Sequence, residues 1–380
     1  MRPTYAEIDL RAIAHNLQQI RAKVAPAGIM AVVKANAYGH GALEVARAAL
    51  ASGATHLAVA LVEEGIELRA AGVKAPILVF GGTVPEQAPL FLEHDLIATV
   101  YERQGAGALA QAAQRAGKSA RLHVKVDTGM GRVGVAWEEA LPFLNWLAGE
   151  RGLQIDGIYT HFATSDDKDK AFAELQLARF AEVAEGVEAM GLRVLRHAAN
   201  SGAILDLPGS YFDLVRPGVM MYGYYPSPYT SRSVPLRPAM TLKSRVLYVK
   251  RVERGTSVSY GRQFIAAQET TIATLPVGYA DGYNRLLSNR GEVLIRGRKY
   301  PVVGRVCMDQ IMVDLGPESD IHPGEEVVLF GRQGDQEVSV YSICEKLQTI
   351  PYEVTCWVSA RVPRVHTWSP LTGEGDEQER

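Results

Sequence analysis

The sequence predicts an α/β protein in which an N-terminal (β/α)8 TIM barrel is followed by a C-terminal domain made mostly of β-strands. Three observations predict this fold class. Eight short apolar runs alternate with alanine-rich helical stretches between Ile29 and Val215, a proline-rich break follows at residues 226–238, and strand-like runs fill most of the remainder. Repeated βα units predict a parallel sheet, and eight of them match the strand count of a closed barrel. An open, doubly wound sheet is the alternative.

The elements of the first domain follow one another in a regular order. Asp9 is a suitable N-cap for a helix that runs to about Val24. The predicted barrel strands are residues 29–33, 56–60, 76–80, 96–100, 121–126, 155–161, 194–198 and 212–215. Helices fill most intervals, for example residues 106–116 and 171–190. In the second of these helices we expect an apolar stripe to face the core, formed by Phe172, Leu175, Leu177, Phe180 and Val183.

The second domain has a different pattern. Its predicted strands are residues 244–249, 270–275, 292–295, 302–306, 311–314, 326–330 and 337–340, with one helical segment at 340–348. The predicted domains are therefore a barrel at residues 1–235, whose first ten or so residues could pair with the β domain, and a β domain at 236–370. Residues 371–380 are polar, and we expect a disordered tail there.

The composition narrows the class of function. The chain is 47% hydrophobic and 22% charged with a formal net charge of -2, which indicates neither disorder nor a nucleic-acid-binding surface. A small polar metabolite is the more natural partner. Three cysteines without a CxxC pair fit a reducing compartment, and we find neither a secretory signal nor an apolar run of about 18 residues that would span a membrane. These features predict a cytoplasmic protein, and no metal-binding spacing is present.

Polar residues follow the predicted strands at the points where those strands end. They are Lys34 after the first strand, Lys125 and Asp127 at the end of the fifth, His161 at the end of the sixth, Asn200 and Ser201 after the seventh, and Arg216 after the eighth. In a barrel these ends share one rim, where active sites are built. Lys34 ends an apolar run, and a lysine amine near apolar surroundings can have its pKa lowered enough to act as a nucleophile. The alternative for Lys34 is a solvated strand-end lysine.

One motif suggests a different enzyme class. Residues 129–134 read Gly-Met-Gly-Arg-Val-Gly and match the dinucleotide fingerprint GxGxxG, which would indicate a nicotinamide or flavin enzyme. The motif follows the fifth strand rather than the first, and Arg132 stands at its centre. A tight loop is the better explanation of these glycines.

Several segments in the same order resemble those of bacterial alanine racemases. They are residues 31–41 (AVVKANAYGHG), 123–132 (HVKVDTGMGR), 197–201 (HAANS), 215–218 (VRPG), 278–282 (GYADG), 306–309 (VCMD) and 351–354 (PYEV). The resemblance covers nearly the whole chain. It implies an isomerase that binds pyridoxal 5′-phosphate, interconverts L- and D-alanine and supplies D-alanine for peptidoglycan.

The resemblance also implies roles for individual residues. Lys34 matches the lysine that holds the cofactor covalently and acts on the D-enantiomer, and Tyr260 matches the base that acts on the L-enantiomer. Inversion is most simply achieved by two acid/base groups on opposite faces of the α-carbon. In the family the tyrosine comes from the second domain of the other subunit, so the resemblance implies a homodimer with a shared active site.

The other implied positions surround these two. Tyr38, Ser201, Gly218 and Tyr352 match the phosphate-binding residues, and Arg216 matches the arginine that faces the pyridine nitrogen, with His161 linking it towards the tyrosine. Arg132, Met308 and Tyr279 match residues at the substrate, and Lys125 matches a lysine that is often carbamylated. Two alternatives remain: a racemase of broader specificity, for example for serine, and a non-enzymatic pyridoxal-phosphate-binding protein. Proteins of the second kind have a single domain, and the β domain argues against them.

Overall fold

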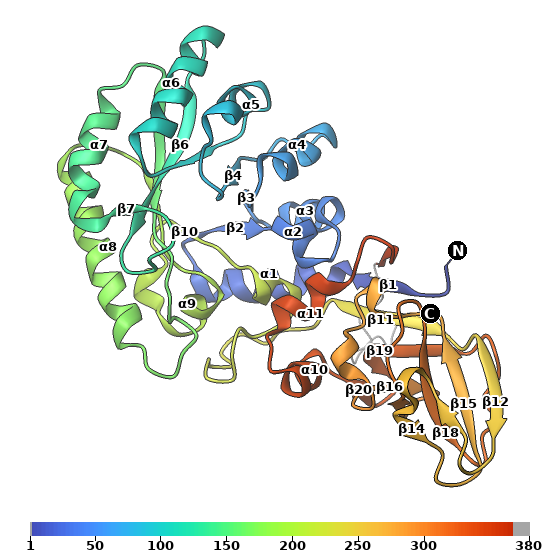
Figure 1. Cartoon of the computed structure of the whole chain (residues 1–380). Helices are drawn as coiled ribbons and strands as arrows, with labels where there is room; N and C mark the ends of the chain where they lie inside the picture. The colour runs from blue at the N-terminus through green and yellow to red at the C-terminus, as the bar shows by residue number, and fades with distance from the viewer. Residues whose placement is uncertain (1, 368–380) are drawn as a thin grey trace, which may run out of the picture. The chain divides into compact units, whose positions relative to one another are not determined.

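The structure, a computed structural model, describes residues 2–367 and forms two compact units. The barrel unit spans Ala14–Arg237, and the β unit comprises the start of the chain up to Ile13 together with the residues from Pro238 onward. Figure 1 shows the elements of both units in chain order. The tail expected at residues 371–380 lies outside the described residues.

The barrel unit contains eight parallel strands that pair in a closed ring. They are β2 (Gly28–Val32), β3 (His56–Val59), β4 (Ile77–Val79), β5 (Ala98–Val100), β6 (Ala120–Asp127), β8 (Leu153–Tyr159), β9 (Leu195–His197) and β10 (Leu214–Val215). Strand β10 pairs with β2, and a bridge between Leu78 and Ile97 joins β4 to β5. The N–H of Asp213 donates to the carbonyl of Arg196 at 3.0 Å and joins β10 to β9. The predicted closed barrel is confirmed, and the open sheet is excluded.

Helical segments precede or follow these strands, and the longer ones lie outside the ring. They are α1 (Leu10–Val24), α2 (Lys34–Tyr38), α3 (Ala42–Ala51), α4 (Val62–Ala70), α5 (Ala88–Glu93), α6 (Arg103–Ala116), α7 (Ala140–Ala148), α8 (Ala171–Ala189) and α9 (Ser201–Asp206). In Figure 1, α6, α7 and α8 form a layer outside the green strands. The predicted cap of α1 is confirmed, since Asp9 Oδ1 accepts the N–H groups of Arg11 and Ala12 at 2.9 and 3.3 Å.

The expected apolar stripe of α8 is only partly correct. Phe180 and Val183 are buried, but Phe172 and Leu175 are exposed. The buried face instead begins with Ala173 and the amide side chain of Gln176, each one residue further along the helix. One residue corresponds to a rotation of about 100° around the helix axis, which is enough to move a side chain from the core to solvent. The apolar pattern did not reveal this face because a glutamine occupies it.

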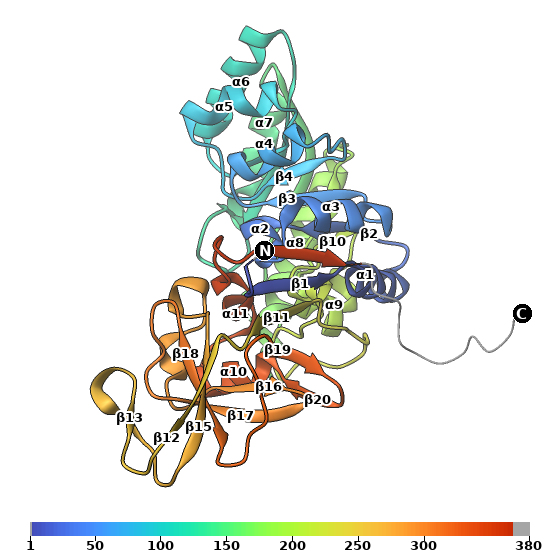
Figure 2. The same ribbon diagram turned by 90° about the vertical axis from the view of Figure 1, so that its right-hand side faces the viewer.

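The β unit is organised around one ten-stranded, mixed sheet. Its strands are β1 (Tyr5–Asp9), β11 (Met240–Arg245), β12 (Tyr248–Val252), β15 (Thr270–Leu275), β16 (Glu292–Ile295), β17 (Arg298–Val303), β18 (Ile311–Gly316), β19 (Glu326–Gln333), β20 (Gln336–Val338) and β21 (Arg364–Thr367). The N-terminal strand β1 runs antiparallel to β11 and parallel to β21, and Figure 2 shows it beside both. A separate hairpin joins β13 (Ser257–Val258) to β14 (Phe264–Ile265), and α10 (Val340–Leu347) and α11 (Pro351–Trp357) complete the unit.

Two expectations for this unit were wrong. The strand expected at residues 244–249 is in fact the end of β11 and the start of β12. Between them Val246 donates to the carbonyl of Glu325 and Leu247 donates to that of Thr274, so the chain changes its hydrogen-bonding partner at this point. Helix α11 was not expected, although its first residue is Pro351, which favours the first turn of a helix. Within residues 2–367 no helix is both long and apolar enough to cross a membrane.

Candidate active site

Eight of the residues singled out from the sequence lie at the carboxyl ends of the barrel strands. Lys34 and Tyr38 follow β2, Lys125 lies near the end of β6 and Arg132 follows it, His161 follows β8, Ser201 follows β9, and Arg216 and Gly218 follow β10. Closing the ring brings these strand ends to one rim, as expected. The candidate catalytic and binding residues of the barrel unit therefore lie at one rim.

Lys34 opens a turn of unusual handedness. The next four residues, Ala35, Asn36, Ala37 and Tyr38, all have positive φ angles, of 52°, 51°, 54° and 52°. This left-handed helical conformation costs an L-residue roughly 1–2 kcal/mol because its Cβ crowds the following carbonyl. The sequence predicted a loop after the strand but not this conformation. Such backbone strain persists only where surrounding contacts hold it.

Aromatic side chains pack beneath the turn. Tyr222 is buried, donates its hydroxyl to the carbonyl of Val32 at 2.8 Å, and lies with its ring 4.9 Å from that of Tyr38 and 4.5 Å from that of His40. Because the last residue of β2 and the end of the turn both contact Tyr222, this side chain helps to fix the position of the Lys34 backbone.

Three of the predicted phosphate-binding groups converge on one small space. Ser201 Oγ accepts the N–H of Gly218 at 3.1 Å, and a Cβ built on Gly218 would lie only 2.6 Å from Tyr38 Oη and 3.9 Å from Ser201 Oγ. Only glycine leaves this space open. Two hydroxyls and a main-chain amide around it are the kind of donor set that binds a phosphate group.

Arg216 is buried without a carboxylate among its hydrogen-bonding partners in the described residues. Its guanidinium donates to the carbonyls of Thr160 and Ala198 at 2.7 and 2.9 Å, and to the ring nitrogens of His197 and His161 at 2.9 and 3.4 Å. Burial lowers the pKa of Arg216 to about 10, so the group still carries its proton at neutral pH. It is a fixed positive charge aimed at the rim.

The arginine determines the tautomers of its histidine neighbours. Since a guanidinium only donates, His197 Nδ1 must accept, and the proton of the neutral ring lies on Nε2. That nitrogen lies 2.8 Å from His123 Nδ1, which must accept in turn. Burial and the charge of Arg216 hold the pKa of His197 well below its usual range, so the ring stays neutral. The same logic makes His161 Nδ1 an acceptor, and burial and Arg216 hold its pKa low as well.

Lys125 is a second buried cation near the rim. Burial, together with the charges of Arg132 and Arg216, lowers the pKa of Lys125 to about 8. The charge of Lys34 acts in the same direction, while Asp127 opposes the shift. A lysine with this pKa has a substantial neutral fraction near neutral pH, and a neutral amine is a nucleophile.

The glycine-rich segment forms a loop around Asp127. The Asp127 carboxylate accepts the N–H groups of Gly129 and Gly131 at 2.9 and 3.0 Å, and a Cβ on Gly134 would lie 2.7 Å from the Asp127 nitrogen. The glycines therefore serve a tight turn that presents Arg132, as the sequence indicated. The segment returns to the sheet as β7 (Val135–Ala136) rather than opening a long helix directly.

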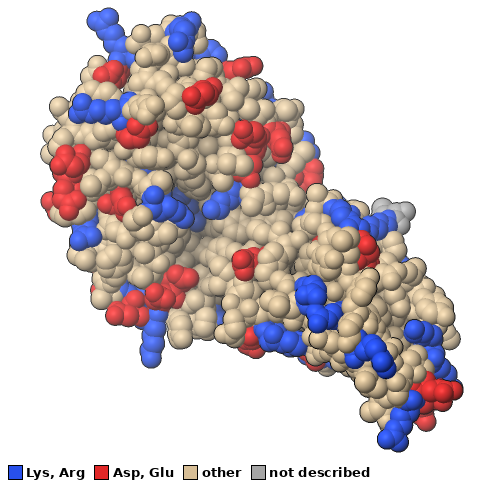
Figure 3. Space-filling model, in the orientation of Figure 1, with Lys and Arg blue, Asp and Glu red and all other residues tan. Residues whose placement is uncertain are grey.

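Four cations therefore influence one another at this rim: Lys34, Lys125, Arg132 and Arg216. Figure 3 shows Lys and Arg side chains flanking a hollow on the barrel unit. Asp127, an acidic residue near these cations, directs its carboxylate to main-chain N–H groups. The site is thus suited to a ligand that carries several negative charges.

The β unit brings three further predicted residues together. Tyr260, Tyr279 and Met308 are 72%, 42% and 52% exposed. Ser259 Oγ donates to the carbonyl of Arg305 at 2.7 Å, while the N–H of Tyr279 donates to the carbonyl of Cys307 at 3.0 Å. The three segments are therefore joined to one another. Tyr352, the fourth predicted residue of this unit, lies in α11.

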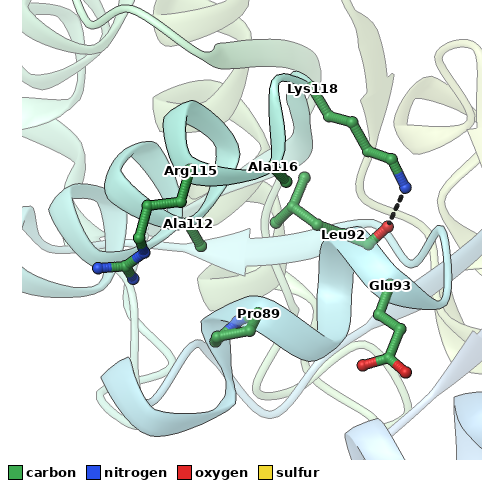
Figure 4. A pocket seen from close by; sticks show the side chains of 7 residues that line it. All are labelled: Pro89, Leu92, Glu93, Ala112, Arg115, Ala116 and Lys118. Atoms are coloured by element: carbon green, nitrogen blue, oxygen red, sulfur yellow. Dashed lines mark hydrogen bonds between the residues drawn. The ribbon is translucent and has the colours of Figure 1, made fainter.

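Other features of the barrel unit stand apart from this rim. A surface pocket of about 310 Å³ lies between α5 and α6 and is shown in Figure 4. Its floor is apolar, and the Lys118 ammonium at its edge donates to the carbonyl of Leu92 at 3.1 Å. None of the predicted site residues lines it. Among the described residues, no three His, Cys, Asp or Glu side chains are grouped to hold a metal ion.

Comparison with known families accounts for almost the whole chain. The model of the alanine racemase N-terminal domain matches residues 8–226, and that of the alanine racemase C-terminal domain matches residues 239–366. This chain belongs to the alanine racemase family. It is 50% identical to an alanine racemase of Desulforamulus reducens over 96% of this chain and 99% of that one. It is 47% identical to alanine racemase 2 of Caldanaerobacter subterraneus over 97% and 96%.

Solved structures of alanine racemases share the fold. The enzyme of Clostridium difficile 630 is 39% identical, with a TM-score of 0.92 over 97% of this chain and 96% of that one. An alanine racemase of Bacillus anthracis with bound L-Ala-P gives 38% and 0.91 over 97% and 95%. One of Bartonella henselae with covalently bound pyridoxal phosphate gives 30% and 0.86 over 97% and 100%. Members of this family are isomerases, and so is this protein.

Three residues that contact the rim had no role assigned from the sequence. Glu64 accepts the N–H of Ala35, Gln176 donates to the carbonyl of His161, and His197 accepts from Arg216. Glu64 and Gln176 lie on helices, where polar residues are expected at the surface. His197 was quoted within a motif, but only its contact with Arg216 reveals what it does. A polar residue inside a buried strand was the one signal that could have identified it.

Proposed function

We propose that this protein is an alanine racemase that uses pyridoxal 5′-phosphate to interconvert L- and D-alanine in a homodimer with shared active sites. The observation that carries the proposal is the rim itself. A lysine at the carboxyl end of β2 shares the rim with three other cations and with an open space lined by hydroxyl and amide groups. Family membership supplies the reaction to which such a site belongs.

The chemistry of the donors fits the cofactor. Tyr38, Ser201 and the amide of Gly218 would hold the phosphate dianion, with Tyr352 from the β unit as a further hydroxyl. Lys34 would hold the aldehyde carbon covalently. Arg216 would donate to the pyridine nitrogen without giving up its proton, because a guanidinium stays protonated. No residue in this set carries a charge of the same sign as the group that it would bind.

The residues of the chain then have separate tasks. Bound pyridoxal phosphate supplies a conjugated, electron-withdrawing system that stabilises negative charge at the α-carbon of an attached amino acid. Once the amino group of the substrate has replaced it on the cofactor, Lys34 Nζ would remove the α-proton from D-alanine, and Tyr260 Oη would remove it from L-alanine. When one of the two removes the proton from its face, the other would donate a proton to the opposite face, which inverts the centre.

Other residues would orient the reacting groups. Arg132 would bind the substrate carboxylate and the phenolic oxygen of the cofactor, with Met308 and Tyr279 bordering the substrate. His161, held neutral as an acceptor from Arg216, would link that arginine towards Tyr260. Lys125 would react as a neutral amine with carbon dioxide, forming an N–C bond and releasing a proton. The resulting anion would orient Arg132.

The exposure of three residues supports the dimer. Tyr260, Tyr279 and Met308 form a joined cluster with large apolar surfaces open to solvent. Exposed patches of this kind often mark interaction sites. We infer that this cluster completes the barrel rim of a second subunit, so that Lys34 and Tyr260 of one active site come from different chains. A bacterial supply of D-alanine for peptidoglycan is the role that this activity would serve.

Exchange in deuterated water tests the function directly. Purified protein loaded with pyridoxal 5′-phosphate should exchange the α-proton of L-alanine and yield both enantiomers at equal concentrations at equilibrium. L-serine and L-lysine, incubated separately, should react much more slowly. Comparable rates with serine would indicate a broad-specificity racemase. Exchange with none of the three amino acids would overturn the proposal and favour a non-enzymatic cofactor-binding protein.

A further inference from the structure

Some main-chain N–H groups of the left-handed turn after Lys34 donate to acceptors inside the turn, and one donates to an acceptor outside it. Inside it, the N–H of Ala37 donates to the carbonyl of Val33 at 2.8 Å, and that of Gly39 donates to Ala35 at 3.0 Å. Asn36 closes the far end by accepting the N–H of Ala42 at 2.8 Å. The N–H of Ala35, the residue directly after the lysine, donates outside the turn. The conformation of the Lys34 backbone therefore depends on a distant acceptor.

That acceptor is Glu64, the third residue of α4. Its Oε1 accepts the N–H of Ala35 at 2.5 Å, and its Oε2 accepts the N–H groups of Ala60 and Leu61 at 2.8 and 3.1 Å. One carboxylate thus joins the loop after β2 to the loop after β3. These strands are neighbours in the barrel, with Val32 paired to Ala58. The Glu64 carboxylate therefore links the two chain segments beyond the last main-chain hydrogen bonds between β2 and β3.

Helix capping accounts for only part of this arrangement. Leu61 is the N-cap residue of α4, and a glutamate three positions later commonly accepts the N-cap N–H. The bond to Ala35 crosses 29 residues of sequence and contributes nothing to the end of α4. If Glu64 served only to cap α4, its Oε1 would not need to accept the N–H of Ala35.

We propose that Glu64 is a positioning residue that holds the left-handed turn and thereby sets where Lys34 Nζ can reach the cofactor. The inference rests on the proposed cofactor role of Lys34. Three N–H donors converge on two carboxylate oxygens, and each bond to a charged acceptor is stronger than a neutral one. The strain of four consecutive left-handed residues is offset by these contacts and by the packing of Tyr222.

Two variants of Glu64 separate the effect of side-chain length from the effect of side-chain charge. In Glu64→Gln the side chain keeps its shape, but one end becomes an NH2 group that faces N–H donors and cannot accept from them. In Glu64→Asp the charge near the start of α4 is kept, but the shorter side chain cannot reach Ala35. The matched control is Glu63→Gln, because Glu63 is exposed on the same helix and, among the described residues, accepts a hydrogen bond from Gln87 Nε2, at 3.2 Å, and not from the turn.

The first measurement is amide hydrogen exchange of residues 35–41 in the protein without cofactor. Both Glu64 variants should exchange about tenfold faster in this segment, while β6 keeps its protection. The second is the dissociation constant for pyridoxal 5′-phosphate, followed by its visible absorption, which should rise about tenfold in both Glu64 variants. Glu63→Gln should match the parent protein in each measurement.

The two measurements separate this inference from the proposed function. Unchanged exchange and cofactor affinity in Glu64→Gln would overturn the positioning role, even if the protein racemises alanine. Faster exchange that leaves cofactor affinity unchanged would also overturn it, since the turn would then not control the lysine. If Lys34 proved not to bind the cofactor at all, the proposed function would fall, while the exchange experiment would still show whether Glu64 holds the turn.

Discussion

The rim of the barrel unit and the exposed cluster of the β unit contain different kinds of residues. Arg216, Lys125 and Ser201 are buried, and the arginine has four hydrogen-bonding partners that fix its direction. Tyr260 and Met308 are more than half exposed, and main-chain hydrogen bonds hold their loops while their side chains face solvent.

This difference suggests a division of labour. A group that binds a cofactor gains from being fixed before the cofactor arrives, because less freedom is lost on binding. A group that must be supplied to another subunit has to remain at the surface until that subunit covers it. The buried rim is therefore the binding half of the proposed site, and the exposed cluster is the half that a dimer would complete.

The largest predicted effect separates these halves. Lys34→Ala should abolish both covalent cofactor binding and racemisation. Tyr260→Phe should leave cofactor binding unchanged and lower kcat by about 100- to 10,000-fold, which is the usual contribution of an acid/base group. Visible absorption after dialysis and racemisation rates measure the two properties. A Tyr260→Phe protein with a near-normal rate would contradict the two-base mechanism.

Mixing the two inactive variants tests whether the halves come from different chains. In a heterodimer, one active site combines the intact Lys34 of one chain with the intact Tyr260 of the other. Random exchange of subunits in an equal mixture should therefore restore about a quarter of the normal activity if the dimer is symmetric. If both residues of each site came from one chain, no activity would return.

Much of the barrel rim could be predicted from the sequence because parallel strands of a barrel end at one rim. That rule placed Lys34, His161 and Arg216 at one rim, while their individual roles came from the resemblance to a family. The left-handed turn was not predicted, since Ala35 and Ala37 have no preference for positive φ and only Asn36 tolerates it readily. Tertiary contacts with Glu64 and Tyr222 impose the conformation, and no local pattern contains them.

The exposed cluster had no such rule to reveal it. A tyrosine beside glycine, as at Tyr260, is an ordinary turn residue when read locally, and its role was inferred only from the resemblance to a family. Gln176 was missed for the opposite reason. A polar side chain on a helix is usually at the surface, whereas this one is fully buried because the loops at the rim supply its hydrogen-bonding partners.

An intermediate effect is expected from Gln176, which joins two loops of the rim. Its amide donates to the carbonyl of His161 at 3.1 Å and to the hydroxyl of Thr128 at 3.3 Å, and its oxygen accepts the N–H of Ala163 at 2.8 Å. Gln176→Leu leaves these groups without that partner, which should destabilise the protein by about 1–3 kcal/mol and lower kcat about tenfold. Urea unfolding and kinetics measure the two effects.

A second substitution on the same helix controls for lost stability. Val183 is buried in α8 and takes no part in these hydrogen bonds, so Val183→Ala should destabilise the protein through a cavity without lowering kcat. In Gln176→Glu, the side chain can donate to the carbonyl of His161 only when it is protonated. The activity of that variant should therefore improve as pH falls, relative to the parent protein. If Gln176→Leu and Val183→Ala had equal kcat values, Gln176 would not be needed to position the residues of the rim.

The smallest effect concerns Lys125, a buried cation whose charge can change under mild conditions. Its pKa of about 8 means that the neutral amine, which reacts with carbon dioxide, falls to about one hundredth of the total at pH 6. Carbamate formation should therefore be seen at pH 8–9 and lost as pH falls.

With 13C-labelled bicarbonate, the parent protein should show a carbamate resonance that is absent in Lys125→Met and retained in Lys118→Met, which changes an exposed lysine. Bicarbonate should raise kcat at pH 8 by about threefold, the order expected for orienting one arginine hydrogen bond. A Lys125 amine that stays unlabelled at pH 9 would show that Arg132 is oriented without a carbamate, and that Lys125 contributes no negative charge to the rim.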